Sequence, residues 1–447
     1  MAPSSNRGRW LMLIRASVVM FLIGTLYSWG IFTEPLLLLF RWNLTTTTLS
    51  FGIANFCLAA IGTVYGGFWQ DRVGPRKVAM VGISLWGLGN CLAGLGTPTF
   101  GAAWLYLTYG VIGGIGAGMA YIAPLALVSK WFSDRRGLAG GVVTASFALG
   151  AFIYNQCIPR LPRFHAVAVH AGHLLASRMS DPAAGAFGSI AGGSVGSVAS
   201  GEVDAVMHVF IASGLAFLLL GLPAACLFRN PAPKLVADHF AAPATGSPDG
   251  YPPSKVLVMP QFYLLWLQLF ANAIAGLSII SNAVPLIADL TNLSAASIAP
   301  LFGTVSICNA AGRFLWGGIS DRIGCNKTFI AMFVLQATTL LWLGQAHELS
   351  SALTGISIVL LCCGGGFGTM PSYNAQYFGT KYMGLNYGLV LSAWGFAGLI
   401  GPTLLARARD SSGSYSTILP AIALVLCVSV ILPLVTRPPR TAGIEQE

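Results

Sequence analysis

Long apolar spans set the strongest limit on how this chain can fold. A helix of about 20 apolar residues crosses the roughly 30 Å hydrocarbon core of a bilayer. Only 9% of the 447 residues are charged, against about 25% in a typical soluble protein, so we expect an all-α membrane protein. The sequence predicts twelve transmembrane helices, near residues 11–33, 48–70, 77–97, 102–127, 137–157, 206–228, 262–287, 297–320, 328–345, 351–371, 384–406 and 415–436.

The basic residues indicate the orientation of these helices. If the N-terminus is cytoplasmic, 17 of the 24 Lys and Arg residues fall in cytoplasmic segments and six in outer segments. The positive-inside bias therefore predicts that both termini are cytoplasmic, in a multi-pass protein of the plasma or inner cell membrane. The net charge of +10 reflects this topology, and the partner it predicts is the lipid bilayer, with no nucleic acid.

Two polar segments divide the chain. The Pro-rich stretch 229–259 predicts a cytoplasmic linker between an N-terminal six-helix bundle, 1–228, and a C-terminal one, 260–447. Residues 158–205 predict an outer loop, whose Gly/Ser-rich tail favours flexibility. The first span is too long for a signal peptide and lacks its cleavage site, so it is interpreted as the first membrane helix.

The two halves repeat one motif. GFWQDRVGPRK at 67–77 returns, 250 positions later, as GGISDRIGCNK at 317–327. A looser echo with an offset of 247 relates the Gly-Leu-x-x-Gly run at 137–141 to that at 384–388. A parallel repeat of six spans predicts two pseudosymmetric bundles with a central site between them.

The repeated loop resembles the signature loop of the major facilitator superfamily, and the resemblance covers essentially all twelve spans. Its glycines allow close helix approach, and its aspartate can cap or pair at the cytoplasmic helix ends. The resemblance implies a cytoplasmic gate. Its residues would be Gly67, Asp71, Arg72, Gly74, Gly317, Asp321, Arg322 and Gly324.

A narrower resemblance rests on two longer runs. The K-W-F-x-D-R-R-G-x-A-x-G run within 109–141 and the N-Y-G-x-x-x-S-A-W-G run within 378–402 are similar to the oxalate:formate antiporter branch. That branch is related to the monocarboxylate transporters, whose eighth helix carries a substrate-handling arginine. The oxalate exchangers also carry a lysine in the eleventh helix, whereas this chain has Ala397 one turn past Trp394.

Arg313 is the one charge that the spans place deep in the membrane. It precedes Asp321, at the cytoplasmic end of its span, by eight residues, or about 12 Å of helix. Asn309, one turn earlier, offers only a neutral oxygen. An unpaired guanidinium suits a substrate carboxylate, which it can bind with two hydrogen bonds. The alternative is an arginine that helix-end carbonyls and water satisfy, or one that reaches to the interface.

Three aromatic residues lie at mid-span on helices that line the cavity in this fold: Tyr27, Tyr121 and Trp394. The resemblance implies that they wall in a small anion, and ordinary packing is the alternative. One cation balances one carboxylate. The substrate predicted is therefore a small monocarboxylate such as formate, lactate or pyruvate.

Transport is the function that the sequence favours. An enzyme would need paired acids, a nucleophile set or a metal cluster within the spans, and the sequence offers none, so no metal or cofactor is expected. The three histidines at 165, 170 and 173 have no standard metal-site spacing, which favours a solvated loop or a short amphipathic helix. Proton symport needs a titrating group, for which Glu34 is the best candidate. We expect a monomeric exchanger, with proton-coupled symport or oxalate:formate exchange as alternatives.

Overall fold

The computed structural model describes residues 6–42, 44–179, 200–231, 250–291, 295–346, 348–412 and 418–439. These residues form helices joined by short turns, and no strand occurs among them. Within them, eight segments are long and apolar enough to cross a membrane. They are Gly8–Ser28, Leu49–Val73, Pro75–Trp131, Arg136–Arg160, Gly201–Cys226, Pro260–Ile280, Leu349–Phe378 and Met383–Gly401.

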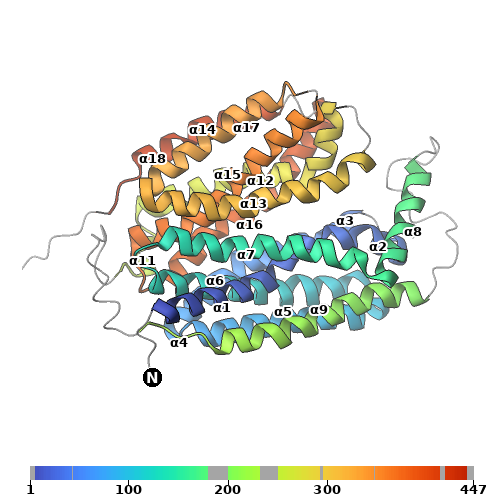
Figure 1. Ribbon diagram of the computed structural model, residues 1–447, viewed down its shortest axis with the longest axis horizontal. Helices are drawn as coiled ribbons and strands as arrows, with labels where there is room; N and C mark the ends of the chain where they lie inside the picture. The colour runs from blue at the N-terminus through green and yellow to red at the C-terminus, as the bar shows by residue number, and fades with distance from the viewer. Residues whose placement is uncertain are drawn as a thin grey trace, which may run out of the picture.

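The helices form two bundles that lie side by side, as Figure 1 shows with the first half in blue to green and the second in yellow to red. The first half comprises α1 (Asn6–Gly24), α2 (Gly30–Phe40), α3 (Leu44–Phe56), α4 (Thr63–Val73), α5 (Pro75–Leu105), α6 (Gly114–Trp131), α7 (Arg136–Cys157), α8 (Pro162–Met179) and α9 (Ser200–Cys226). The second comprises α11 (Pro253–Val256), α12 (Pro260–Thr291), α13 (Ala295–Ile323), α14 (Cys325–Leu343), α15 (Leu349–Phe378), α16 (Met383–Ser412), α17 (Leu419–Ser429) and α18 (Ile431–Val435).

Irregular helical turns interrupt the first half. Residues Thr25–Ser28 form a 3₁₀ turn between α1 and α2, while Cys57–Gly62 and Tyr106–Gly113 form π-helical segments. The helical path of the first predicted span, 11–33, therefore continues past that span, through α2 to Phe40. A 3₁₀ or π turn frees backbone groups and redirects side chains, which is why such turns often occur near functional sites.

The 57-residue segment Pro75–Trp131 contains the third and fourth predicted spans. The chain reverses at Gly101, whose φ of 68° and ψ of −154° interrupt the helical path. A glycine adopts such a backbone conformation without a steric penalty. The indole of Trp104 then donates a 2.7 Å hydrogen bond back to the carbonyl of Leu92, which ties the two arms of this hairpin together.

The repeated loops adopt the same backbone turn in both halves. Gly74 separates α4 from α5 with a φ of 87°, and Gly324 separates α13 from α14 with a φ of 86°. Each glycine N–H donates to the carbonyl four residues earlier, at 2.8 Å from Gly74 and 3.0 Å from Gly324. The matching geometry explains why glycine occupies both positions: any other residue would be strained at this φ.

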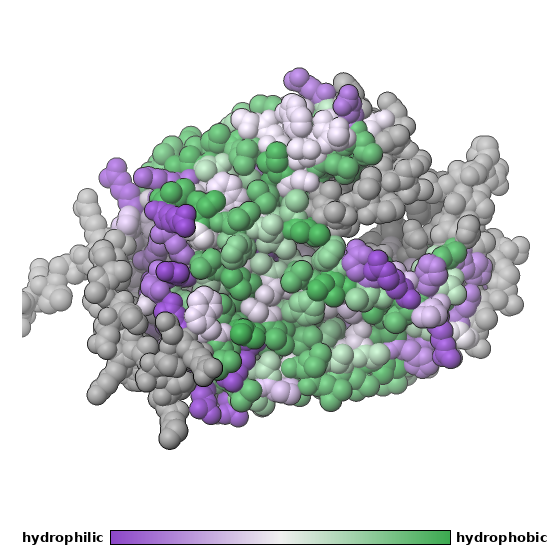
Figure 2. Space-filling model, viewed as in Figure 1, coloured by the Kyte–Doolittle hydropathy of each residue, from purple (hydrophilic) through white to green (hydrophobic). Residues whose placement is uncertain are grey.

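The surface is organised as a membrane protein requires. Figure 2 shows an apolar band, in green, across the middle of the molecule and hydrophilic side chains, in purple, concentrated towards its two ends. The end that carries Asp71, Asp134 and Asp321 is called the carboxylate end below. The helix α8 lies at the opposite end (Figure 1).

The predicted outer loop is partly helical. The chain forms α8 within it, and α9 begins at Ser200, six residues before the predicted span. Phe164 of α8 is buried and packs edge-on against Phe32 of α2, with ring centroids 5.7 Å apart. Residues 180–199, which hold most of the predicted flexible tail, lie outside the described residues, as do residues 232–249 of the predicted linker. The last three residues of that tail, 200–202, begin α9.

Candidate functional site

Arg313 lies inside the protein, where α13 of the second half meets α7 of the first. Its side chain is buried, with 2% exposed. Its Nε donates to Oδ1 of Asn309 at 3.2 Å, and its Nη1 donates across the two halves to the carbonyl of Thr144 at 3.2 Å. Both partners are neutral, and the described part of the chain gives Arg313 no ion pair. The cation therefore keeps its charge uncompensated.

Glycines let the neighbouring helices reach the backbone of Arg313. A Cβ added at Gly141 of α7 would lie 2.5 Å from the Arg313 carbonyl oxygen, and one at Gly368 of α15 would lie 2.1 Å from it. Real Cβ atoms do not approach carbonyl oxygens so closely. These glycines therefore allow α7 and α15 to pack directly against α13 and to enclose the guanidinium.

Two aromatic rings lie against the guanidinium, and three more pack around them. Its carbon lies 5.0 Å from the centroid of Phe367 and 5.5 Å from that of Phe147, within cation–π range. The rings also contact one another around Trp394, whose centroid is 5.6 Å from that of Tyr121 and 5.9 Å from that of Tyr27. We call this group, Tyr27, Tyr121, Phe147, Phe367 and Trp394, the aromatic cage.

Three tyrosine hydroxyls in this region are buried without a hydrogen-bond partner among the described residues. They belong to Tyr27, Tyr121 and Tyr387. The charge of Arg313 lies close enough to act on all three side chains. Leaving a buried hydroxyl unpaired costs about 1–3 kcal/mol, so these groups favour any ligand that can accept from them.

The structure brings all of the predicted substrate-site residues to one place. Arg313, Tyr27, Tyr121 and Trp394 come from four different helical segments, and Asn309 fixes Arg313 from one turn away. Sequence reasoning missed Thr144, Phe147, Phe367 and Tyr387. Tyr387 could have been found, because it lies within the N-Y-G run that carries the family resemblance. Phe147 and Phe367 cannot be told from ordinary apolar residues by sequence.

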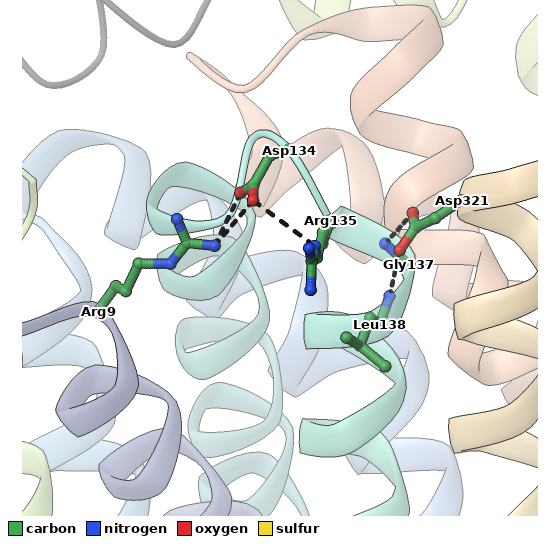
Figure 3. Close-up of polar contacts among 6 residues, drawn as sticks. All are labelled: Arg9, Asp134, Arg135, Gly137, Leu138 and Asp321. Atoms are coloured by element: carbon green, nitrogen blue, oxygen red, sulfur yellow. Dashed lines mark hydrogen bonds and ion pairs between the residues drawn. The ribbon is translucent and has the colours of Figure 1, made fainter. Parts of the chain in front are cut away.

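Asp321 joins the two halves at the carboxylate end. Its carboxylate accepts hydrogen bonds of 2.8 Å from the backbone N–H groups of Gly137 and Leu138, at the start of α7 (Figure 3). The N-terminus of a helix carries unpaired N–H groups and partial positive charge, so a carboxylate stabilises it. Asp321 is therefore a helix cap supplied by the opposite half.

Asp71 makes the equivalent contact in the other direction. It accepts from the N–H groups of Gly384 and Leu385, at the start of α16, at 3.0 and 2.9 Å. The glycines of the motif permit this approach: a Cβ at Gly67 would lie 2.1 Å from the carbonyl oxygen of Gly384. The second half repeats this, with a Cβ at Gly317 placed 2.4 Å from the carbonyl oxygen of Gly137.

The arginines of the motif do not join these contacts. Arg72 is exposed and lies over the Phe68 ring at 3.9 Å, and Arg322 is also exposed. A different arginine, Arg9 of α1, donates to both oxygens of Asp134 at 2.9 Å, in the turn that precedes α7 (Figure 3). Burial raises the pKa of Asp134, but the hydrogen bonds and charge of Arg9 outweigh it, and the pKa lies below its usual value.

Two of the three histidines predicted in the outer loop make separate contacts. The ring of His165 lies 3.1 Å from the carbonyl of Pro159, and that of His170 lies 3.0 Å from Glu202. The side chains of His173 and Glu34 lie outside what the structure describes. Across the described residues, no three His, Cys, Asp or Glu side chains gather in a way that would hold a metal ion.

These features together define a multi-pass membrane protein with the fold of a transporter: two helical bundles, a buried cation between them and reciprocal caps at one end. The sequence profile of the Major Facilitator Superfamily matches residues 10–155, 177–402 and 266–445. The chain belongs to the Major Facilitator Superfamily, as the repeated loop predicted.

Relatives and solved structures agree with this assignment. The chain is 26% identical to the oxalate:formate antiporter of Oxalobacter formigenes, over 91% of this chain and 86% of that protein. It is 25% identical to apicoplast pyruvate carrier 1 of Toxoplasma gondii, over 87% and 75% of the two chains. The fold is similar to that of the proton:xylose symporter XylE, with a TM-score of 0.69, 13% identity and 98% of each chain covered.

Proposed function

We propose that this transporter carries small monocarboxylates by alternating access, and that Arg313 binds the substrate carboxylate. The observation that carries the proposal is the uncompensated guanidinium, buried between the halves with two neutral partners. A buried cation without a counterion is costly, and a substrate anion would supply that counterion. The missing counterion favours a substrate-binding role for Arg313 over the alternative in which backbone carbonyls alone satisfy it.

The free groups of the site match a carboxylate. Guanidinium has five N–H donors, and the described contacts use two of them, so three remain for a ligand. The unpartnered hydroxyls of Tyr27 and Tyr121 can donate to the same anion without adding charge. Among the described residues, Arg313 is the one cation that contacts the aromatic cage, and the buried position one turn past Trp394 is Ala397 instead of a lysine. One carboxylate therefore balances the charge of the site.

The reciprocal caps support a gate at the carboxylate end, which we place in the cytoplasm. Asp71 and Asp321 each bind a helix of the opposite half, so both contacts must break before the halves separate there. The glycines at 67 and 317 let the same helices touch. Exchange is the mode proposed, because an anion is needed to neutralise Arg313 in each direction, and a relative with 26% identity is named an antiporter.

The test uses purified protein in vesicles loaded with formate, lactate, pyruvate or oxalate, with uptake of the labelled acids measured from outside. Exchange requires that uptake rise when the same acid is present inside and that a proton gradient alone not drive it. Arg313→Lys keeps the charge but loses the planar guanidinium, whose paired N–H groups can bind both oxygens of a carboxylate. We therefore expect a folded protein with a large loss of substrate affinity. If Arg313→Ala unfolds while transport per folded molecule is unchanged, the arginine is structural and the proposal is wrong.

A further inference from the structure

We propose that Tyr387 is a specificity-determining residue of the substrate site, and that its hydroxyl donates a hydrogen bond to the bound anion. The inference rests on the proposed function of Arg313 and adds a contact that the sequence did not single out. Tyr387 belongs to α16, is completely buried, and has no hydrogen-bond partner for its hydroxyl among the described residues.

The pseudosymmetry places Tyr387 at the depth of Arg313. A Cβ at Gly141 would lie 2.5 Å from the Arg313 carbonyl, and one at Gly388 would lie 2.5 Å from the Thr63 carbonyl. Thr63 and Arg313 are equivalent positions of the repeat, 250 residues apart, and the two glycines are equivalent in the looser echo. The two contacts therefore lie at the same depth, and Tyr387 adjoins Gly388.

Helix geometry turns Tyr387 towards the aromatic cage. It precedes Trp394 by seven residues, or two helical turns, so both side chains lie on one face of α16. Trp394 contacts Tyr27, Tyr121 and Phe367 on that face. Electrostatic interactions of Tyr387 with both Tyr121 and Arg313 agree with this placement.

An unpartnered hydroxyl at this place makes a specific demand on the ligand. Phenylalanine would fill the same space without the cost of burying an unpaired O–H group. The hydroxyl of Tyr387 therefore destabilises the substrate-free protein. The cost is recovered when an anion accepts the hydrogen bond. The backbone N–H of Leu385, two residues before Tyr387, donates to Asp71. The start of α16 therefore carries both the Tyr387 contact and one of the contacts of the proposed gate.

The experiment compares substrate binding by the wild type and Tyr387→Phe in detergent. Formate, lactate, pyruvate and oxalate are screened by thermal shift, and the acid that stabilises the wild type most is titrated by calorimetry. We expect Tyr387→Phe to weaken binding by about tenfold, which corresponds to the loss of one hydrogen bond to a charged group. The melting temperature without substrate should equal or exceed that of the wild type.

Tyr373→Phe is the matched control. Tyr373 is also completely buried, and its hydroxyl has no hydrogen-bond partner among the described residues. Its ring packs against Phe329 and Tyr377, and no ring contact in the described part of the chain joins it to the aromatic cage. Its removal should leave affinity unchanged. If Tyr387→Phe binds as tightly as the wild type while Arg313→Lys loses binding, the role of Tyr387 is refuted and the proposed function stands. If Arg313→Lys also binds normally, the proposed function itself is wrong.

Discussion

The guanidinium of Arg9 donates two 2.9 Å hydrogen bonds to the carboxylate of Asp134. The pair links the start of the first helix to the turn that precedes α7, three residues before the N–H group of Gly137 that Asp321 binds (Figure 3). Arg9 also lies 4.5 Å from the centroid of the Phe132 ring in the same turn. The start of α7 is therefore held from both halves at once.

The Arg9–Asp134 pair should make stability depend on pH in one direction. The pKa of Asp134 is lowered in the folded protein, so its contribution is complete above the unfolded value of about 3.9 and is lost as pH falls through the folded pKa. Arg9→Gln should lower the melting temperature slightly at pH 7, since partly exposed pairs contribute about 0.2–1 kcal/mol. The difference from the wild type should shrink in strong acid.

Arg15→Gln serves as the control for this measurement, because Arg15 of the same helix donates to a neutral carbonyl, that of Leu227. Its effect on the melting temperature should not change with pH. A pH-independent effect of Arg9→Gln as well would show that the contact acts through packing against Phe132 instead of through charge.

Neutralising either helix cap should favour opening at the carboxylate end. Asp71→Asn and Asp321→Asn each retain one acceptor oxygen but lose the charge that the helix N-terminus attracts, worth about 0.3–1 kcal/mol. We expect transport rates to change several-fold, substrate affinity to change less, and a cysteine placed near Gly384 to react faster with a soluble thiol reagent. Asp204→Asn, at the opposite end on α9, is the control. Unchanged labelling in both variants would contradict the gate.

A methyl group at Gly67 should prevent the closed contact. Its Cβ would lie 2.1 Å from the backbone oxygen of Gly384, which cannot move aside as a flexible side chain can. Gly67→Ala should therefore fold but lose most of its transport, with the carboxylate end open. Gly318→Ala adds the same methyl group next to Gly317, where the nearest atom is a side-chain carbon of Leu138 at 3.6 Å. Equal activity of the two variants would rule out the close-contact explanation.

A second cation should redirect the site towards dianions. Ala397 is completely buried one turn past Trp394 of the aromatic cage. Ala397→Lys should raise uptake of oxalate relative to lactate, since two carboxylates then find two cations. Ala397→Met has a side chain of similar length without the charge, and it should leave the preference unchanged. A wild type that already prefers oxalate over formate and lactate would show that charge matching does not set the substrate.

The sequence was enough to predict the fold because hydropathy and the repeat are long-range signals. Gly74 and Gly324 recur 250 positions apart and adopt the same positive φ, so the repeat reports a real structural equivalence. The exact position of the turn at Gly101 and the helical continuation of the first span to Phe40 were not predicted. Apolar composition does not show where a helix bends.

The site was only partly predictable for a related reason. Arg313 is detectable because a charge in an apolar span is costly and rare. Arg313 also contacts the backbone carbonyl of Thr144 and the ring of Phe147. Every residue has a carbonyl and many residues of this chain are aromatic, so residue type alone does not identify these two. The partners of Asp71 and Asp321 are backbone N–H groups, so sequence could suggest capping but could not say which helix each would cap.

The reciprocal caps have a consequence for how such a chain can be assembled. The starts of α7 and α16 each receive their carboxylate from the other half, so neither half contains the acceptor for its own helix. A single six-helix unit of this design would meet that requirement only by pairing with a second copy of itself. Covalent fusion of the two halves keeps them in equal number, and it allows equivalent positions to hold different residues, as Thr63 and Arg313 do.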